Sequence, residues 1–376
     1  MKLVIAPDKF KGSLTGLEFC DAVKKGVKQV YPQAEIIKLP LADGGDGTIE
    51  ILDYHITGEH IELVVSDPLF RPVNASYFFI PSTQTAFIEM AEASGMKLLD
   101  SVEQNCMDTT TYGTGELILD AIKKGAKEIV VGIGGSATND CGIGMAAALG
   151  YKFLDKRGRE VNPIGKNLSF INSIDASREI EKLKNVQFKV ACDVTNPLYG
   201  KNGAAYVYAS QKGASTSEVD ILDQGLRHIA KKIREKFKID VQNIEGGGAA
   251  GGMGVGTKMF LNATLTSGIE LIKDMIEFED KIRDSAWIIT GEGKLDHQTL
   301  SGKTIKGVMD SAKNSNLKVA AFCGKSELNT GELKIFGISY IDEVMNYTEN
   351  FDDAITNSFK YVSLMANNFA KKLKDL

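Results

Sequence analysis

Residues 2–39 read KLVIAPDKFKGSLTGLEFCDAVKKGVKQVYPQAEIIKL, and this stretch decides the fold class. Its start, residues 2–6, is a short apolar run that predicts a buried strand. Residues 17–30 carry apolar side chains along one helical stripe, and residues 35–39 predict a second strand. Strand, helix and strand in this order indicate an α/β protein with a parallel sheet.

The pattern changes after residue 57 and later returns. Residues 60–90 alternate as antiparallel strands do, which suggests the start of a second domain. The alternation of strand and helix seen at the start of the chain resumes with a helix at 114–124 and a strand at 128–131. It returns near the end of the chain, where we expect strands at 286–290, 318–323 and 339–344 and, between and after them, helices at 304–314 and 351–372.

Between these segments we expect strands at 186–192 and 205–208 and a charged helix at 218–237. The sequence therefore predicts a discontinuous parallel-sheet domain made of residues 1–57, 96–149 and 266–376. A second, mixed α/β domain would contain residues 58–95 and 150–265.

Composition excludes several classes of protein. A chain of 376 residues with 43% hydrophobic and 25% charged residues suits a globular protein of two domains. Its net charge of −5 argues against a large nucleic-acid-binding surface. No apolar run approaches the ~20 residues of a membrane span, and the amino-terminal run is too short for a secretory signal. We expect a cytoplasmic protein with no nucleic-acid or membrane partner. Its five scattered cysteines predict neither disulfides nor a zinc cluster.

Residues 132–140, GIGGSATND, follow a predicted strand and could bind a phosphate group. Backbone N–H groups and hydroxyls in such a loop form an anion cradle. The candidate residues are Gly132, Gly134, Gly135, Ser136, Thr138 and Asn139. The loop also fits the pattern G-x-G-x-x-A through Ala137, with Asp155 about 20 residues on, which imitates a dinucleotide-binding fingerprint. That match is weak, because glycine-rich sequences produce such spacings readily.

Three other loops attract attention. In residues 8–13, Asp8, Lys9 and Lys11 precede a predicted helix, whose N-terminus favours anions; a solvated loop is the alternative. In residues 42–48, ADGGDGT, Asp43 could hold Mg²⁺ or orient a hydroxyl, although a plain turn is possible.

Residues 246–254 contain six glycines in nine positions. We expect close backbone approach to a ligand there, with a flexible hinge as the competing interpretation. The ligand-binding candidates are Gly248, Gly251, Gly252 and Gly254.

Carboxylates close two further predicted strands. Asp193 is a candidate for metal binding or for accepting a substrate proton, and a turn-forming aspartate is the alternative. Glu292 and Asp296 offer metal ligands. Residues 301–304, SGKT, resemble the end of a P-loop, but His297 stands where that motif requires glycine, so a Walker A site is absent and Lys303 remains only a nucleotide-binding candidate.

Covalent catalysis is not indicated. The four histidines show no ligand spacing, and no G-x-S-x-G motif occurs. Glycine cradles with carboxylates and lysines are what phosphoryl transfer requires, because its catalysis consists of positioning and charge neutralisation.

Eight segments in chain order carry a resemblance. They read APDKFK at 6–11, ADGGDGT at 42–48, GTGEL at 113–117, GIGGSATND at 132–140, ACDVTNPL at 191–198, QKGA at 211–214, GAAGGMG at 248–254 and TGEGKLD at 290–296. Together they strongly resemble the bacterial class I glycerate kinases. Departures from that family are slight: Asp46 stands where glutamate is common, and Lys294 where arginine also occurs.

The resemblance implies a two-domain α/β fold with a discontinuous Rossmann-like or flavodoxin-like domain and an active site in the interdomain cleft. It further implies phosphoryl transfer from ATP, with Mg²⁺, to D-glycerate, and 2-phosphoglycerate is favoured over 3-phosphoglycerate.

On this expectation, Asp193 or Asp43 accepts or orients the substrate hydroxyl, and Lys9 or Lys11, near Asp8, meets the carboxylate or the phosphoryl group. The glycines of 132–135 and 246–254 contact ATP phosphates, and Glu292 and Asp296 act on Mg²⁺. Two other functions remain open: an NAD-dependent oxidoreductase, and a non-enzymatic two-lobed protein that binds a hydroxy acid.

Overall fold

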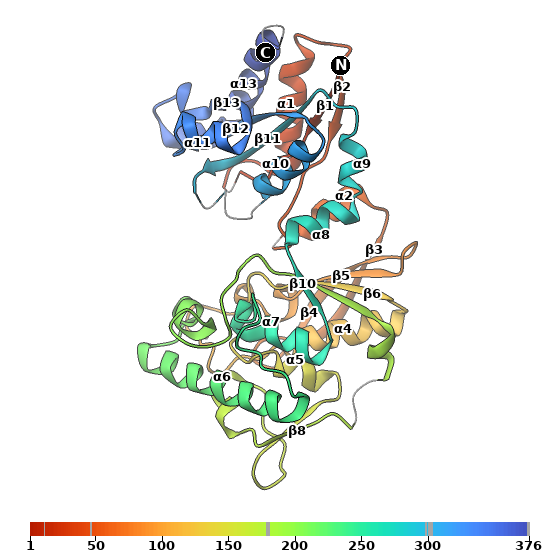
Figure 1. Ribbon diagram of the computed structural model, residues 1–376, viewed down its shortest axis with the longest axis vertical. Coiled ribbons are helices and arrows are strands. Elements are labelled where there is room, and N and C mark those ends of the chain that lie inside the picture. Colours follow the sequence, from red (N-terminus) through yellow and green to blue (C-terminus); the bar gives the residue numbers. More distant parts are fainter. Residues whose placement is uncertain (11, 46, 178–180, 298, 300–303, 374–376) are drawn as a thin grey trace. The chain divides into compact units, whose positions relative to one another are not determined.

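The computed structural model describes residues 1–10, 12–45, 47–177, 181–297, 299 and 304–373. The chain forms two compact units (Figure 1). The first unit comprises Met1–Asp43 and Ile269–Leu376, and the second comprises Gly44–Gly268. The predicted α/β class and the discontinuity of the parallel-sheet unit are therefore confirmed.

The first unit is built on a five-stranded sheet in which every pair of neighbours is parallel. In spatial order its strands are β13 (Ile338–Glu343), β12 (Lys318–Ser326), β11 (Trp287–Leu295), β1 (Lys2–Ile5) and β2 (Glu35–Lys38). Leu3 of β1 lies opposite Trp287 on one side and Ile36 on the other. The central strands β1, β11 and β12 contain apolar runs, as is typical of a parallel sheet covered by helices on both faces.

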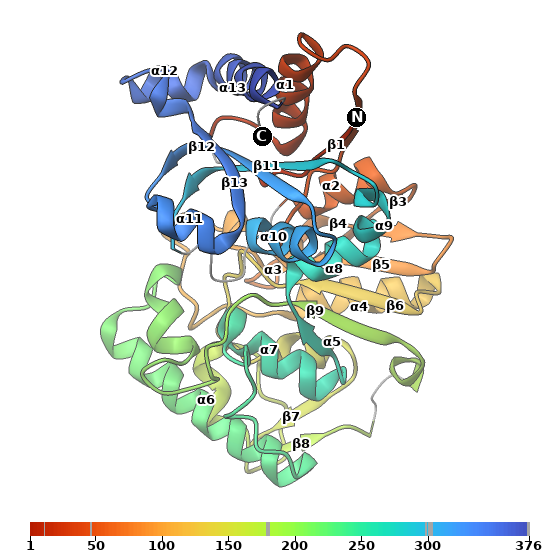
Figure 2. The ribbon, with the colours of Figure 1, turned by 45° about the horizontal axis from the view of Figure 1, so that its top comes forward.

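The helices of this unit are α1 (Gly16–Lys28), α8 (Gly268–Met275), α9 (Phe278–Ile282), α10 (Thr304–Asn314), α11 (Thr330–Phe336), α12 (Phe351–Thr356) and α13 (Ser358–Lys372). Figure 2 shows α1 and α13 along one face of the sheet and α10 on the other. Gly26 permits the close packing of α1 on α13, because an added Cβ would lie 2.1 Å from the carbonyl oxygen of Ser363. A capping box of Thr15 and Glu18 starts α1.

The second unit contains a mixed six-stranded sheet. In spatial order its strands are β10 (Thr264–Thr266), β9 (Gln187–Ala191), β6 (Glu128–Gly132), β5 (Thr85–Glu89), β4 (Pro72–Ile80) and β3 (Glu59–Ser66). The first four are parallel, and β4 and β3 are antiparallel, as predicted for residues 60–90. A separate antiparallel pair is formed by β7 (Lys152–Leu154) and β8 (Ser173–Asp175).

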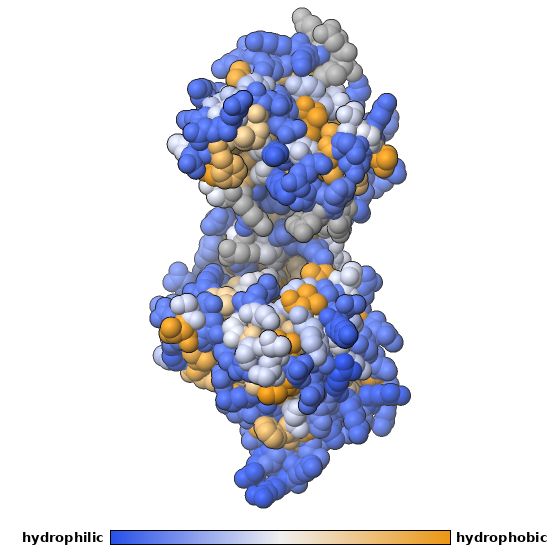
Figure 3. Space-filling view, turned by 90° about the vertical axis from the view of Figure 1, so that its left-hand side faces the viewer, coloured by the Kyte–Doolittle hydropathy of each residue, from blue (hydrophilic) through white to orange (hydrophobic). Residues whose placement is uncertain are grey.

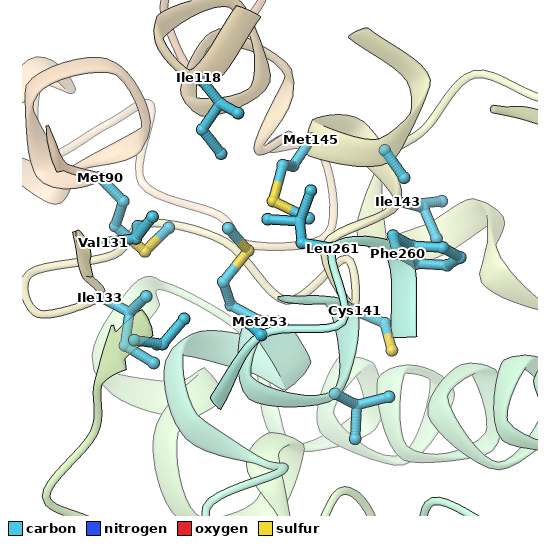
Figure 4. Packing of buried hydrophobic residues seen from close by; sticks show 14 of the residues in the cluster. Met90, Ile118, Val131, Ile133, Cys141, Ile143, Met145, Met253, Phe260 and Leu261 are labelled. Atoms are coloured by element: carbon cyan, nitrogen blue, oxygen red, sulfur yellow. The ribbon is translucent and has the colours of Figure 1, made fainter. Parts of the chain in front are cut away.

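The helices of the second unit surround one large apolar core. They are α2 (Thr48–His55), α3 (Ala91–Ser94), α4 (Tyr112–Lys124), α5 (Ile143–Ala148), α6 (Thr216–Phe237) and α7 (Ala249–Phe260). Figure 4 shows Val131 of β6 among side chains of that core, with Met90, Met145, Met253 and Leu261 nearby. The glycine-rich loop after β6 is thus anchored in a rigid, buried element.

Three expectations need correction. Residues 44–57 and 96–149 belong to the second unit, because β6 pairs with β5 and β9 rather than with the first sheet. Residues 205–208 are not a strand: Ala205–Ala209 form a π-helical turn that buries its two end alanines and exposes Tyr206. The expected helix at 351–372 is two helices, broken at Asn357.

Among the described residues, no helix is both long enough and apolar enough to cross a membrane. On the face drawn in Figure 3, hydrophilic residues predominate, and hydrophobic ones form small separate patches.

Candidate functional site

Three chain segments of the second unit meet at the carboxyl ends of its parallel strands. A Cβ added to Gly132, at the end of β6, would lie 2.3 Å from the carbonyl oxygen of Gly44. A Cβ added to Gly44 would lie 2.4 Å from the Cβ of Ala191, at the end of β9. Gly134 similarly faces Gly45. The loops can touch only because these positions are glycine and have no Cβ. Open parallel sheets place their ligand sites at this edge.

Glu89 ends the neighbouring strand β5 and was not among the predicted residues. Its carboxylate accepts a hydrogen bond of 3.1 Å from the N–H of Ile49 in the first turn of α2. The Thr48 hydroxyl donates to the carbonyl oxygen of Gly45 at 2.7 Å. A carboxylate at a helix N-terminus is favoured by the helix dipole, so Glu89 holds the 44–48 loop against the strand ends.

Asp193 follows β9 at the same edge of the sheet. The side chain is exposed, and Oδ1 accepts a hydrogen bond of 3.0 Å from the N–H of Gly268, the first residue of α8. The carboxylate therefore has a structural role in the start of a helix, besides the catalytic role that the sequence suggests.

The glycine-rich segment 246–254 packs against the chain's own backbone. At Gly251 φ is +71°, and an added Cβ would lie 2.1 Å from the carbonyl oxygen of Thr138. Gly252, with φ of +92°, approaches Cys141 in the same way. Gly248 and Gly254 contact the carbonyl oxygens of Pro197 and Gly246. The segment therefore approaches protein backbone closely, and the expected approach to a ligand stays a prediction.

Beneath the exposed turn at Gly134 and Gly135 lies a set of buried polar side chains, which we call the buried polar cluster: Ser136, Thr138, Asn139, Asp140 and Lys212. The ammonium of Lys212 donates to the Ser136 hydroxyl at 2.6 Å and to the Thr138 carbonyl oxygen at 2.9 Å. Burial lowers the pKa of Lys212 to about 8. Both side-chain polar atoms of Asn139 and the hydroxyl of Thr138 have no hydrogen-bond partner among the described residues.

Asp140 has a different role in the buried polar cluster. Its carboxylate accepts hydrogen bonds from the N–H and the hydroxyl of Thr111, both at 2.8 Å, and from the N–H groups of Gly142 and Gly144. Complete burial raises the pKa of this carboxyl group. Asp140 thus fixes the end of the glycine-rich loop to the starts of α4 and α5.

The first unit gathers a second set of predicted residues. The N–H of Asp8 donates to the carbonyl oxygen of Gly291 at 2.9 Å, which places Asp8 beside β11. Burial raises the pKa of Asp8, and the charge of Asp43 raises it further, whereas the hydrogen bond from the Lys9 N–H acts in the opposite direction. Lys9 and Asp43 are exposed. The predicted residues Lys11 and Lys303, and Asp46, lie outside the described residues.

Glu292 and Asp296 occupy the end of β11. Glu292 is half-buried and lies opposite Cys323 of β12. Asp296 accepts a hydrogen bond of 3.3 Å from the N–H of Thr299 and lies 3.4 Å from the ammonium of Lys294. Among the residues that the structure describes, no three His, Cys, Asp or Glu side chains form a metal-binding group.

The dinucleotide-binding interpretation of the 132–137 loop fails on topology. Its fingerprint requires an acidic residue after a neighbouring parallel strand. Asp155 instead follows β7, in the separate two-stranded pair, where it accepts a hydrogen bond of 2.9 Å from the Arg159 side chain. The spacing was therefore coincidental.

Parallel strands that end in glycine-rich loops, with carboxylates and a buried lysine beside them, define an α/β protein equipped for anionic small molecules. The profile of the glycerate kinase family matches residues 3–374. The chain belongs to the glycerate kinase family, and it is accordingly a kinase.

Full-length relatives agree with this assignment. The chain is 41% identical to a protein of Escherichia coli K12 named glycerate 2-kinase, covering 99% of this chain and 98% of the relative. It is also 41% identical to a glycerate kinase of Bacillus subtilis 168, covering 100% and 98%. A crystal structure described as glycerate kinase 2 from Salmonella typhimurium LT2 is 40% identical, with a TM-score of 0.89 over 100% of this chain and 98% of that one.

Proposed function

We propose that this protein transfers the γ-phosphoryl group of ATP to a hydroxyl of D-glycerate, with Mg²⁺, and that 2-phosphoglycerate is the favoured product. The identity over nearly the whole chain to a relative named glycerate 2-kinase supports this substrate and this product. The observation that carries the proposal is the meeting of the 44–45 loop, the 132–135 loop and the end of β9 at one edge of the sheet.

The residues present at this edge fit a nucleotide. Gly134 and Gly135 are exposed, and they lie directly before Thr138 and Asn139, whose buried polar atoms have no partner among the described residues. A phosphate group has several strong acceptor oxygens, and it is recognised by loops in which backbone N–H groups and hydroxyls converge. ATP phosphates therefore suit the 132–139 loop.

The acidic residues of the first unit fit Mg²⁺. This ion prefers oxygen ligands and is usually held by one or two carboxylates together with substrate phosphates and water. A site completed by nucleotide phosphates needs no cluster of three acidic side chains, so Glu292 and Asp296 suffice as its protein ligands. When bound, the ion neutralises charge on the β- and γ-phosphates.

Side chains of the enzyme then position the acceptor. In direct in-line transfer, the oxygen of the glycerate hydroxyl forms a bond to the γ-phosphorus while the bond from that phosphorus to the ADP oxygen breaks. Asp193 or Asp43 accepts the hydroxyl proton or orients the hydroxyl, and ADP leaves with the electron pair. Lys9 or Lys11 meets the substrate carboxylate or the transferred phosphoryl group, with Asp8 beside them.

Proton-coupled ³¹P NMR of the purified protein with ATP, Mg²⁺ and D-glycerate tests the proposal. A new phosphomonoester signal split into a doublet would identify 2-phosphoglycerate, because carbon 2 bears one hydrogen. A triplet would identify 3-phosphoglycerate and would contradict the favoured product. A mixture without glycerate is the control for ATP hydrolysis. Intact ATP and no new signal would overturn the kinase proposal for this substrate.

A further inference from the structure

Lys212 is a buried cation that forms no ion pair with any described residue. It ends a short 3-10 turn, Ser210–Lys212, and its side chain is 4% exposed. The ammonium carries three N–H donors, and the two acceptors that it reaches, Ser136 Oγ and the Thr138 carbonyl oxygen, are neutral. Among the described residues, no carboxylate forms an ion pair with it. A buried charge is costly unless it is paired, so this arrangement calls for an anion.

The charged and titratable groups around Lys212 do not supply that anion. Cys106 and Asp140 are the ones that act on it electrostatically. Burial raises the pKa of the Cys106 thiol to about 11, so the thiol is neutral near pH 7. The carboxylate of Asp140 is already held by four donors, two from Thr111 and two from backbone N–H groups. Among the described residues, no carboxylate therefore contacts the ammonium of Lys212, and an external oxyanion would supply its direct ionic partner.

Two neighbours of Lys212 add an independent observation. Asn139 is 1% exposed and Thr138 is fully buried, yet the amide of Asn139 and the hydroxyl of Thr138 lack partners among the described residues. Leaving a buried polar group unsatisfied is destabilising, so such groups mark positions where a ligand or a water completes the bonding.

We infer that Lys212, together with Ser136, Thr138 and Asn139, forms an oxyanion-binding site for one of the two reactants. The oxyanion is either a phosphate of ATP or the carboxylate of D-glycerate. The inference rests on the proposed function and extends it to a lysine in the QKGA segment. Lys212 would bind the reactant directly through its remaining N–H donor.

The competing explanation is a structural cross-link, in which Lys212 only fastens the 136–138 backbone and a water satisfies Asn139. The two explanations predict different effects of Lys212→Met on ligand binding. Both allow some loss of stability, because the variant removes the hydrogen bonds to Ser136 and Thr138. Only the oxyanion-binding site predicts that the affinity for one reactant falls.

The experiment compares Lys212→Met with Lys273→Met. Lys273 is also buried, but its ammonium lies 2.9 Å from the carboxylate of Glu270 and 3.3 Å from that of Glu279. We expect K273M to lower Tm and to leave ligand affinities unchanged. We expect K212M to weaken, about 100-fold in calorimetric titration, the binding of one ligand, either Mg·ATP or D-glycerate. The ligand affected identifies the source of the oxyanion.

A K212M protein that binds both ligands normally would overturn the inference. If K212M does not fold, the proton-uptake measurement on the unmodified protein decides the question.

A second measurement needs no variant. Burial lowers the pKa of Lys212 to about 8, so its neutral fraction in the ligand-free protein grows as pH rises from about 6.5 to about 9.5. A bound oxyanion raises this pKa, so proton uptake on binding should grow over the same range of pH. Calorimetry in buffers of different ionisation enthalpy measures this uptake. Absence of uptake for both ligands would overturn the inference.

The two proposals can fail separately. If the unmodified protein makes no phosphoglycerate, the proposed function fails. If it does so, and K212M has the same kcat/KM and the same affinities, only the role of Lys212 fails.

Discussion

The carboxylate of Asp193 accepts a hydrogen bond of 3.0 Å from the backbone N–H of Gly268, the first residue of α8. One side chain is thus both a proposed participant in chemistry and a stabiliser of a helix start. Substitution by alanine removes both roles, whereas asparagine keeps an oxygen that can accept the Gly268 hydrogen bond. The pair of variants separates the two contributions.

We expect Asp193→Asn to lower kcat about 100-fold or more, because the amide cannot accept a proton, and to change the free energy of unfolding by less than about 0.5 kcal/mol. Asp193→Ala should show the same loss of kcat and a further loss of about 1 kcal/mol of stability. Steady-state kinetics and urea unfolding measure both quantities. Near-normal turnover by Asp193→Asn would remove the carboxylate from the mechanism.

The pKa of Asp8 predicts a change in stability of known sign. Burial and the charge of Asp43 raise this pKa in the folded protein, so the folded state holds its proton to a higher pH than the unfolded state. The ionised side chain therefore destabilises the fold as pH rises from the unfolded pKa, about 3.9, through the higher folded value. Asp8→Asn should raise Tm at pH 7 and lower kcat/KM.

The same variant contains its own control. At pH 4 and below, Asp8 of the unmodified protein also becomes protonated, so the difference in Tm between the two proteins should shrink. Thermal unfolding followed from pH 4 to pH 8 tests this trend. A lower Tm for Asp8→Asn than for the unmodified protein at pH 7, with the difference vanishing toward pH 4, would mean that the pKa of Asp8 is lowered, not raised, by folding.

Gly251 and Gly158 allow a matched test of backbone packing. Both have positive φ, +71° and +76°, but an added Cβ meets the Thr138 carbonyl oxygen at 2.1 Å in the first case and nothing within 4 Å in the second. Gly158→Ala should cost about 1 kcal/mol, the ordinary penalty of a left-handed backbone. Gly251→Ala should cost about 3 kcal/mol, because a forced backbone shift is added. Equal losses in urea unfolding would mean that the loop moves freely aside.

Glu292 is expected to govern the dependence on Mg²⁺. Glu292→Gln should raise the half-saturating Mg²⁺ concentration about tenfold or more, because a charged oxygen ligand is lost. Glu327→Gln is the control. Glu327 is another carboxylate near the end of β12 and pairs with Lys294 at 3.0 Å, and its loss should leave the Mg²⁺ dependence unchanged. Identical titration curves for the unmodified protein and Glu292→Gln would exclude Glu292 as a ligand.

Sequence patterns predicted the individual elements of this fold better than their assembly. Strands buried on both faces, such as β1 and β12, read as apolar runs with little ambiguity. The membership of β6 in the second sheet could not be predicted, because both sheets contain parallel strands of the same composition and pairing partners are decided by tertiary packing. The turn Ala205–Ala209 was mistaken for a strand because its tyrosines alternate, although its buried alanines are spaced as in a helix.

The parts of the candidate site that consist of glycine-rich loops could be predicted from the sequence, because glycine itself indicates unusual backbone geometry. Glycines at 132–135 and 246–254 lie where the backbone approaches other parts of the chain, whereas the contacts with a ligand predicted for these segments stay predictions. Lys212 is not predicted as a site residue, although it belongs to the QKGA segment that carries part of the resemblance. Lysine in a polar segment ordinarily indicates an exposed side chain. The burial of Lys212 depends on Ser136 and Cys106, which are distant in sequence.

The pairing of β1 with β11 has a consequence for biosynthesis. Leu3 and Trp287 are neighbours in the sheet but are separated by more than 280 residues of chain. At a translation rate of about 5–20 residues per second, β1 and β2 leave the ribosome roughly 15–60 seconds before their partner strand exists. The second unit, whose residues are contiguous, can fold during that interval. Until β11 emerges, one edge of β1 has no strand to pair with, which makes the nascent first unit the part of the chain that depends most on protection from aggregation.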